Sequence, residues 1–235
     1  MRVRLRLADP GSLSSAELVR ARALLGEEER AYLERCRHPR RQREYLVGRA
    51  LLRLTLAERL GEPAAALAFE EGERGRPGLI GAPEGAPSFN LSHTQGLLVL
   101  ALAPAQSSVG VDLEYTPRRL ELDRLARRHF TEAEHAAMLA LPEEVQRERF
   151  FELWTLKEAY MKARGLGFAL PSRSFGFGIE GGRVVSFRPE AGREDEAGSW
   201  SFSLDTPTAT HQVAVAAFTG GEGVEFVSEW VRSLD

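Results

Sequence analysis

Ser88-Phe-Asn-Leu-Ser-His-Thr94 is followed by the apolar run Leu97-Leu-Val-Leu-Ala-Leu-Ala103, and this pair organises the whole sequence. A similar pair, Ser201-Phe-Ser-Leu204 and the apolar residues 213–218, recurs near the end of the chain. Short apolar runs bounded by turn residues are typical of buried strands. The repetition predicts an α+β fold of two similar α/β halves with a pseudo-twofold relation, each with helices followed by strands. We expect a ligand to bind in the cleft between the halves.

The other patterns place helices and strands in both halves. Residues 2–7 alternate between polar and apolar side chains, which predicts a strand. Apolar residues recur every three or four positions over 40–60, which predicts an amphipathic helix that ends at Gly61. Thr131 and Glu134 have the spacing of a capping box, which predicts the start of a later helix. Further helices are expected at 14–25, 27–36, 120–128 and 142–164, and further strands at 67–70, 97–103, 109–115, 174–179, 184–187, 199–204 and 212–218. We divide the chain into a first half, residues 1–108, and a second half, residues 109–235.

The composition excludes several classes of protein. The chain has 235 residues, 43% of them hydrophobic, and a net charge of −3, which is ordinary for a globular protein. A single cysteine, Cys36, permits neither a disulfide framework nor a cysteine-ligated zinc site. The longest apolar run, residues 97–103, is far shorter than the ~20 residues that span a bilayer, and the N-terminus lacks a signal-peptide pattern. We expect a cytoplasmic protein that does not bind membranes.

Two acidic residues alternate along one predicted strand, Gly110-Val-Asp-Leu-Glu-Tyr115. Side chains two apart on a strand point to the same face, so Asp112 and Glu114 project side by side. Carboxylates this close repel one another unless a cation neutralises them. Ligands that supply only oxygen favour Mg²⁺ or Ca²⁺. The plain alternative is a solvated strand face.

A third acidic residue lies on the predicted helix Phe150-Phe-Glu-Leu-Trp-Thr-Leu-Lys-Glu-Ala-Tyr-Met-Lys162. This helix is apolar on most sides, so Glu158 would be largely covered and would need a cation. Lys162, four residues later, could supply it as an ordinary helical ion pair, or a metal could be shared with the two strand carboxylates. Only two of the 31 basic residues are Lys, and both of them, Lys157 and Lys162, lie in this segment.

Positive charge gathers in the first half. Nine of residues 30–59 are Arg and three are acidic. A solvated face is the plain explanation, but Arg side chains also suit phosphate. The cluster precedes Gly75-Arg-Pro-Gly78 and Asn90-Leu-Ser-His93, whose small residues could present backbone amides to phosphate. Nucleic-acid binding is a poor alternative, because the net charge is negative and few aromatic residues interleave with the arginines. Together with the three acids, the pattern suits an enzyme that acts on a pyrophosphate with magnesium.

Four motifs, in order, resemble those of the 4′-phosphopantetheinyl transferases, specifically the longer, monomeric Sfp type. The motif G-(K/R)-P stands here as Gly75-Arg-Pro77 and F-N-x-S-H-(S/T) as Phe89-Asn-Leu-Ser-His-Thr94. The motif G-(I/V)-D-(I/L)-E stands as Gly110-Val-Asp-Leu-Glu114, and W-x-x-K-E-(A/S)-x-x-K as Trp154-Thr-Leu-Lys-Glu-Ala-Tyr-Met-Lys162. Order and spacing agree over roughly residues 30–180.

The resemblance implies a coenzyme A site between the two halves and a role for each matched residue. It implies magnesium ligands at Asp112, Glu114 and Glu158, with Glu158 as general base and Lys162 as a second catalytic residue. It implies coenzyme A contacts from Ser92, His93, Lys157 and Lys162 at the phosphates and the pantetheine arm, and from Arg76 and Pro77 at the adenine. The arginines for the 3′-phosphate match loosely, and we choose Arg43 and Arg49 ahead of Arg35 and Arg40.

The reaction that the resemblance implies moves 4′-phosphopantetheine from coenzyme A to a serine of an acyl or peptidyl carrier protein. Adenosine 3′,5′-bisphosphate is released. The carrier would present an acidic helix, and Arg118, Arg119 and Arg124 are our hypothesis for the surface that steers it. A noncatalytic coenzyme A-binding homologue and an acyltransferase that uses coenzyme A as donor are the alternatives. The sequence leaves the carrier open, whether from fatty-acid, polyketide or peptide synthesis.

Overall fold

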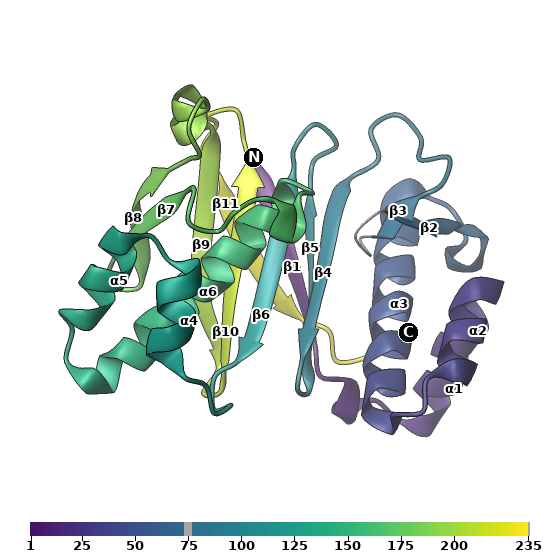
Figure 1. Ribbon diagram of the computed structural model, residues 1–235. Helices are drawn as coiled ribbons and strands as arrows, with labels where there is room; N and C mark the ends of the chain where they lie inside the picture. Colours follow the sequence, from purple (N-terminus) through teal and green to yellow (C-terminus); the bar gives the residue numbers. More distant parts are fainter. Residues whose placement is uncertain (73–76, 235) are drawn as a thin grey trace.

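The computed structural model describes residues 1–72 and 77–234, and two sheets lie face to face at its centre (Figure 1). The first sheet contains β11 (Glu225–Trp230), β1 (Arg2–Ala8), β5 (Leu97–Ala103) and β4 (Ser88–Thr94), in that order. The second contains β6 (Val109–Tyr115), β10 (His211–Phe218) and β9 (Trp200–Thr208). Helix α3 (Pro39–Leu60) packs on the outer face of the first sheet and α6 (Glu143–Ala163) on that of the second.

Smaller elements surround these layers. They are α1 (Ser15–Leu24), α2 (Glu27–Arg35), α4 (Leu122–His129), α5 (Glu132–Leu139) and the hairpins β2 (Phe69–Glu71) with β3 (Pro77–Leu79) and β7 (Gly176–Glu180) with β8 (Arg183–Arg188). The capping box predicted at Thr131 and Glu134 is present at the start of α5. Helix α3 ends at Gly61, whose φ of 70° is a left-handed conformation that glycine adopts without steric cost.

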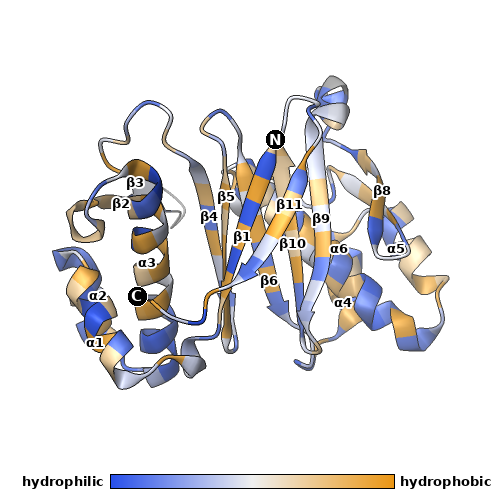
Figure 2. Ribbon diagram, turned by 180° about the vertical axis from the view of Figure 1, so that it is seen from behind, coloured by the Kyte–Doolittle hydropathy of each residue, from blue (hydrophilic) through white to orange (hydrophobic). Residues whose placement is uncertain are grey.

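Apolar side chains fill three layers. Val47, Leu51 and Leu56 of α3 pack on the first sheet, and a second apolar layer lies between the two sheets. The third layer lies between α6 and the second sheet. Every residue of β5 is buried because α3 covers one face of the strand and the second sheet covers the other, and hydrophobic residues run along the central strands in Figure 2.

The internal repetition seen in the sequence corresponds to two hairpins. Strands β4 and β5 pair in antiparallel fashion in the first sheet, and β9 and β10 pair in the same way in the second. In each sheet the later strand of the hairpin also pairs with the opening strand of its half, β1 or β6. The prediction of an α+β fold with two halves, each a helix packed on a sheet, is therefore confirmed.

The last strand does not stay with the half to which the sequence assigned it. Strand β11 was not predicted, and it pairs in parallel with β1 of the first sheet. Leu234, near the C-terminus, is buried in the core under α3. The final segment, β11 and the residues after it, therefore packs with the first half, although a division between residues 108 and 109 assigns it to the second. None of the helices in the described part of the chain is both long enough and apolar enough to span a membrane.

Candidate active site

Five of the predicted site residues gather where β4, β6 and α6 meet, which we call the seam: Ser92, Asp112, Glu114, Glu158 and Lys162. Strands β4 and β6 are edge strands of the two sheets and lie in contact. Gly110 of β6 lies against the backbone of α6, where a Cβ atom would stand 2.1 Å from the carbonyl oxygen of Ala159 and 2.4 Å from the nitrogen of Ala163. Only glycine permits this approach. Gly110 therefore lets β6, which carries Asp112 and Glu114, pack directly on α6, which carries Glu158.

Asp112 lies at the centre of the seam, 6% exposed. Its Oδ1 accepts a hydrogen bond from Lys162 Nζ at 2.7 Å, and Lys162 also donates to Ser92 Oγ at 3.1 Å. Ser92 Oγ lies 3.4 Å from the same carboxylate oxygen. The other oxygen, Oδ2, is buried and has no hydrogen-bond partner. The helix of the second half and a strand of the first half therefore meet at one carboxylate that is only half satisfied.

Glu114 lies two residues further along β6, and both of its polar contacts are made through one of its carboxylate oxygens. Its Oε1 accepts from Trp154 Nε1 at 2.9 Å and lies 3.1 Å from the guanidinium of Arg118. Burial raises the pKa of Glu114, and the neighbouring Asp112 carboxylate raises it further. Arg118 was predicted to steer a carrier protein, but its side chain is engaged at Glu114 and lies over the ring of Phe151.

Glu158 is the third carboxylate of the seam. Burial raises its pKa to about 7, and the carboxylates of Asp112 and Glu114 act in the same direction while Lys162 opposes them. A carboxyl group with this pKa is poised to accept a proton near neutral pH. The three acids therefore share one electrostatic environment, and when all three are ionised their negative charge exceeds the positive charge of Lys162 and Arg118.

The donor chemistry of the seam fits a hard divalent cation. All three side chains supply oxygen, Asp112 Oδ2 is an orphaned buried acceptor, and mutual repulsion helps to raise two of the pKa values. As they stand, no three His, Cys, Asp or Glu side chains among the described residues are arranged to hold a metal. The acids would thus have to turn toward a common point to bind one.

His93 flanks the seam on β4, about half exposed. Its Nδ1 lies 3.7 Å from Oε2 of the buried Glu44, and burial lowers its pKa. Lys162 and Arg41 lower the pKa further because they are nearby positive charges. Sequence reasoning missed Arg41, since the run of arginines at 40, 41 and 43 did not show which of them acts electrostatically on this histidine.

A hollow of about 900 Å³ opens between α2, α3 and the β2–β3 hairpin. Arg35 and Arg49 line it, together with Pro77 and the ring pair Tyr32–Tyr45, whose centroids are 4.2 Å apart. Arg49 is paired with the buried Glu29 and stacks over Phe69. Arg76, the remaining predicted contact for adenine, lies outside the described residues.

Arg43 does not join this hollow. Its guanidinium donates to backbone carbonyl oxygens of residues 10, 11 and 13, so it ties the loop before α1 to α3. These bonds commit the Arg43 guanidinium to the backbone, so the structure gives no support to the prediction that Arg43 contacts a phosphate. Arg40, a runner-up, lies 3.4 Å from Glu44, beside His93.

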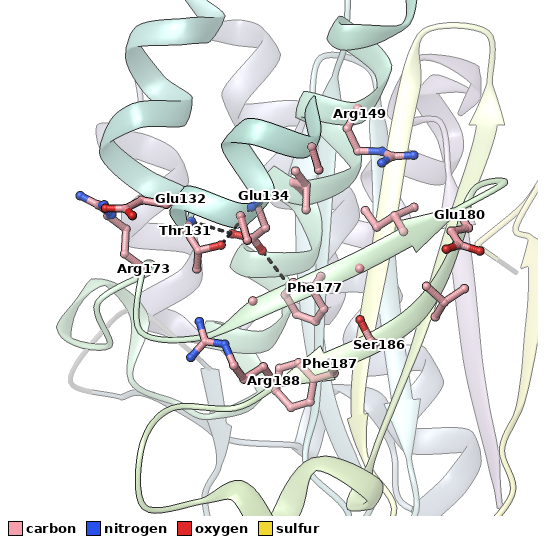
Figure 3. A pocket seen from close by; sticks show the side chains of 17 residues that line it. Thr131, Glu132, Glu134, Arg149, Arg173, Phe177, Glu180, Ser186, Phe187 and Arg188 are labelled. Atoms are coloured by element: carbon pink, nitrogen blue, oxygen red, sulfur yellow. Dashed lines mark hydrogen bonds and ion pairs between the residues drawn. The ribbon is translucent and has the colours of Figure 1, made fainter. Parts of the chain in front are cut away.

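Lys157 lies apart from the seam. Its side chain is 3% exposed, forms a 2.8 Å ion pair with Glu134 and donates to the carbonyl oxygens of Ser172 and Phe175. Adjacent helical residues are turned about 100° from one another, so Lys157 and Glu158 face different neighbours. These contacts use all three hydrogens of the ammonium, so the structure gives no support to the prediction that Lys157 binds a phosphate. Figure 3 shows Glu134 beside a groove of about 800 Å³ that none of the predicted site residues lines.

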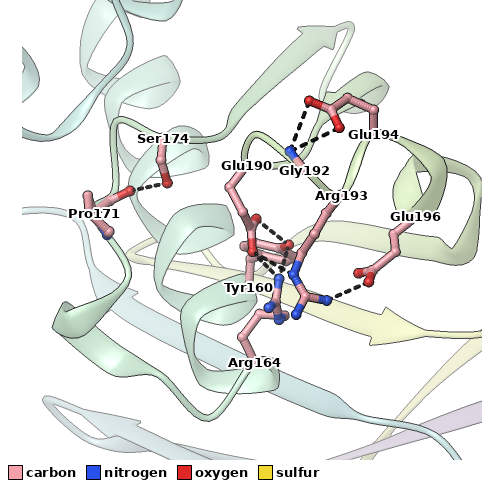
Figure 4. Close-up of polar contacts among 9 residues, drawn as sticks. All are labelled: Tyr160, Arg164, Pro171, Ser174, Glu190, Gly192, Arg193, Glu194 and Glu196. Atoms are coloured by element: carbon pink, nitrogen blue, oxygen red, sulfur yellow. Dashed lines mark hydrogen bonds and ion pairs between the residues drawn. The ribbon is translucent and has the colours of Figure 1, made fainter.

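The end of α6 that carries Lys162 is anchored by a polar network (Figure 4). Tyr160 Oη donates to Glu190 at 2.8 Å and accepts from Arg164 at 2.9 Å, and Arg164 is also paired with Glu190. Arg193 lies 3.7 Å from the same carboxylate. These contacts hold the last helical turn against the segment after β8, and so fix the backbone from which Lys162 reaches the seam.

Comparison with known proteins covers both halves. Residues 108–216 match the family model described as the 4′-phosphopantetheinyl transferase superfamily, and residues 12–105 match the one described as 4′-phosphopantetheinyl transferase, N-terminal. The chain is 37% identical over 149 residues to the 4′-phosphopantetheinyl transferase HetI of Nostoc sp., a match that covers 63% of this chain. It spans 62% of HetI, which is less than two thirds of that relative's length.

Two relatives from Bacillus subtilis are covered more fully. The chain is 30% identical over 164 residues to the 4′-phosphopantetheinyl transferase Sfp of strain 168, covering 69% of this chain and 70% of Sfp. It is 30% identical over 179 residues to the 4′-phosphopantetheinyl transferase ffp, covering 76% of this chain and 77% of that protein. With models matching each half and relatives matching most of its length, the chain belongs to the 4′-phosphopantetheinyl transferase superfamily.

Proposed function

We propose that this protein transfers 4′-phosphopantetheine from coenzyme A to a serine of an acyl or peptidyl carrier protein and releases adenosine 3′,5′-bisphosphate. The observation that carries the proposal is the seam of this superfamily member. There the two acids of the Gly110–Glu114 motif lie together with Glu158 and Lys162 of the Trp154–Lys162 motif. A noncatalytic coenzyme A binder would have no need of three acids that repel one another. We also retain a cytoplasmic monomer as a prediction.

Magnesium is the cation that we propose for the seam, held by Asp112, Glu114 and Glu158. When bound, it would neutralise diphosphate oxygens and stabilise charge on the departing phosphate. Lys162 would then serve as a compact positive charge beside the same phosphates, because its ammonium already bridges Ser92 and Asp112. Each of these residues acts by placing charge and not by forming a covalent bond with the substrate.

Glu158 is the group that we propose takes the proton from the carrier serine. The serine hydroxyl must lose this proton as its oxygen attacks the β-phosphorus of coenzyme A. A carboxylate with a pKa of about 7 is a stronger base than an ordinary one and is still partly ionised at neutral pH. Its position on a buried helical face also keeps it beside the other charged groups of the reaction.

The hollow beside α3 is our proposed site for the nucleotide of coenzyme A. Arg35 and Arg49 would meet the 3′-phosphate, and the Tyr32–Tyr45 pair with Pro77 offers flat apolar surface to adenine. His93, together with Ser92 on β4, would then meet the diphosphate at the seam. Arg43 has no part in this proposal because its guanidinium serves the backbone.

The test is the mass of a carrier protein. Incubation of an apo carrier with the protein, coenzyme A and Mg²⁺ should add one phosphopantetheine group, as read by intact-mass spectrometry. Chelation of the metal with EDTA should reduce the rate at least a hundredfold, and added Mg²⁺ should restore it, because a bound metal contributes several kcal/mol of charge stabilisation.

Other masses would support the alternatives. Coenzyme A binding without any mass gain on several carriers would support the noncatalytic homologue. Addition of an acyl group from acyl-coenzyme A, independent of metal, would support the acyltransferase. Either result contradicts the proposed function.

The carrier surface that we propose is the exposed side of the segment after β6. Arg119 is exposed there, and the side chain of Arg124 on α4 is 84% exposed, whereas Arg118 is committed to Glu114. The double variant Arg119→Glu with Arg124→Glu should raise the KM for an acidic carrier by roughly tenfold through lost electrostatic steering. Steady-state kinetics at low salt measure this change.

The affinity for coenzyme A should stay at the wild-type value in that double variant. Reversal of Arg59, an exposed residue at the end of α3, is the matched control and should leave the carrier KM unchanged. An unchanged carrier KM in the double variant would remove this surface from the proposal.

A further inference from the structure

The seam between β4 and β6 is closed by side chains. Strand β6 pairs with β10 and β4 with β5, both through antiparallel ladders. Within residues 1–72 and 77–234, no ladder joins β4 to β6, although the two strands lie in contact. A ladder sets the register of neighbouring strands, so another device must set it here.

Asn90 of β4 supplies that device. The backbone N–H of Val111 donates to Asn90 Oδ1 at 2.9 Å, and the backbone carbonyl of Val111 accepts from Lys162 Nζ at 3.1 Å. Both backbone groups of this residue are thus taken by side chains, one from each half of the molecule. Asn90 is 5% exposed, so water has little access to replace its bond.

Val111 directly precedes Asp112, so the Asn90 bond holds the backbone next to the carboxylate that we propose as a metal ligand. A strand that shifts by one residue turns its side chains to the opposite face. With Val111 pinned, Asp112 stands opposite Ser92 and within reach of Lys162, which connects the first half to the acids of the second. Asn90 itself has no bond to any of the three carboxylates among the described contacts.

We propose that Asn90 is a positioning residue for the metal-facing acids: its bond to Val111 fixes β6 against β4 and so holds Asp112 in the geometry that binds the cation. This inference rests on the proposed function. It explains the asparagine of the Phe89-Asn-Leu-Ser-His motif, for which the resemblance implied no role. Loss of a group that orients a metal ligand typically costs 10- to 100-fold in metal affinity or activity.

The experiment compares Asn90→Ala with Thr55→Val. Thr55 is also buried in the first half, but its hydroxyl bonds Leu51 and Arg6, away from the seam. Electron paramagnetic resonance measures Mn²⁺ bound to each protein in complex with coenzyme A, and urea unfolding measures stability. Asn90→Ala should bind Mn²⁺ roughly tenfold more weakly and lose kcat by about 10- to 100-fold, with partial recovery at high Mg²⁺. Thr55→Val should lose stability alone.

Two results would overturn the role of Asn90. One is wild-type Mn²⁺ affinity in Asn90→Ala, and the other is an equal loss of Mn²⁺ affinity in Thr55→Val. If Asn90→Ala does not fold, Asn90→Ser, with a shorter polar side chain, takes its place in the same comparison. A wild-type protein that binds Mn²⁺ but modifies no carrier would contradict the proposed function, while the Mn²⁺ comparison would still decide the role of Asn90.

Discussion

Replacement of Glu158 by Gln should reduce kcat for carrier modification by about 10³-fold, because a positioned general base contributes 10²- to 10⁴-fold. Gln has nearly the same shape but cannot accept a proton at neutral pH, and it removes one of three crowded negative charges. The fold should survive, since the charge that is lost is the one that burial and two neighbouring carboxylates disfavour. Intact-mass assays at saturating coenzyme A measure the rate.

The pH dependence of the wild-type enzyme gives a second measurement on Glu158. Without bound metal the pKa of Glu158 is about 7, and a cation at this carboxylate would lower it, so kcat/KM measured at limiting Mg²⁺ should rise with pH through this range and level off above it. In Glu158→Gln this rise should disappear together with the rate. Thr55→Val, whose change lies outside the seam, should keep the wild-type profile. A Gln variant that is as active as the wild type would contradict the assignment of Glu158 as base.

The fold was predictable where local pattern and final packing agree. The apolar run of β5 reads as a strand because it is buried on both faces, and the repeated hairpin shows the two halves. Strand β11 was missed because its residues are mostly exposed and its partner, β1, lies more than 200 residues earlier. A parallel pairing between the two ends of the chain has no local signal for a reader of one sequence.

The site was predictable for residues whose spacing along a strand or helix shows which face their side chains share. Asp112 and Glu114 share a face because strands repeat every second residue, and Glu158 and Lys162 share a face because helices repeat every 3.6. The arginines could not be resolved in this way, since Arg43 and Arg49 differ only in whether a backbone carbonyl or a carboxylate lies within reach. The ion pair of Lys157 had no local signal in the sequence, because its partner, Glu134, comes from a different helix.

The buried pair of Lys157 and Glu134 leads to the largest expected effect on stability. Their side chains are 3% and 2% exposed, and their charged atoms are 2.8 Å apart. Glu134 also accepts from the backbone N–H groups of Thr131 and Phe177, as the dashed lines in Figure 3 show. This one carboxylate therefore joins α5, α6 and β7. Burial lowers the pKa of Lys157 and Glu134 opposes that shift, so the charge of Lys157 depends on its partner.

Lys157→Met should lower the free energy of unfolding by about 3–5 kcal/mol, because it leaves Glu134 as an uncompensated buried charge. Glu134→Gln should cost a similar amount for the opposite reason. Urea unfolding measures both. Arg127→Met is the matched control, since Arg127 pairs with Asp123 at the surface, where both side chains are more than half exposed, and it should cost about 1 kcal/mol or less.

The double variant separates the charge from the packing. If the cost of each single change is an unpaired buried charge, Lys157→Met combined with Glu134→Gln should be less destabilised than the sum of the two, since no charge is then left behind. Additive costs would mean that the lysine contributes through contacts other than its pairing with Glu134, such as its ammonium over the Phe175 ring, 4.6 Å from the ring centroid. A Lys157→Met protein with wild-type stability and no transfer activity would contradict the structural role altogether, and it would return this lysine to the phosphates where the sequence first placed it.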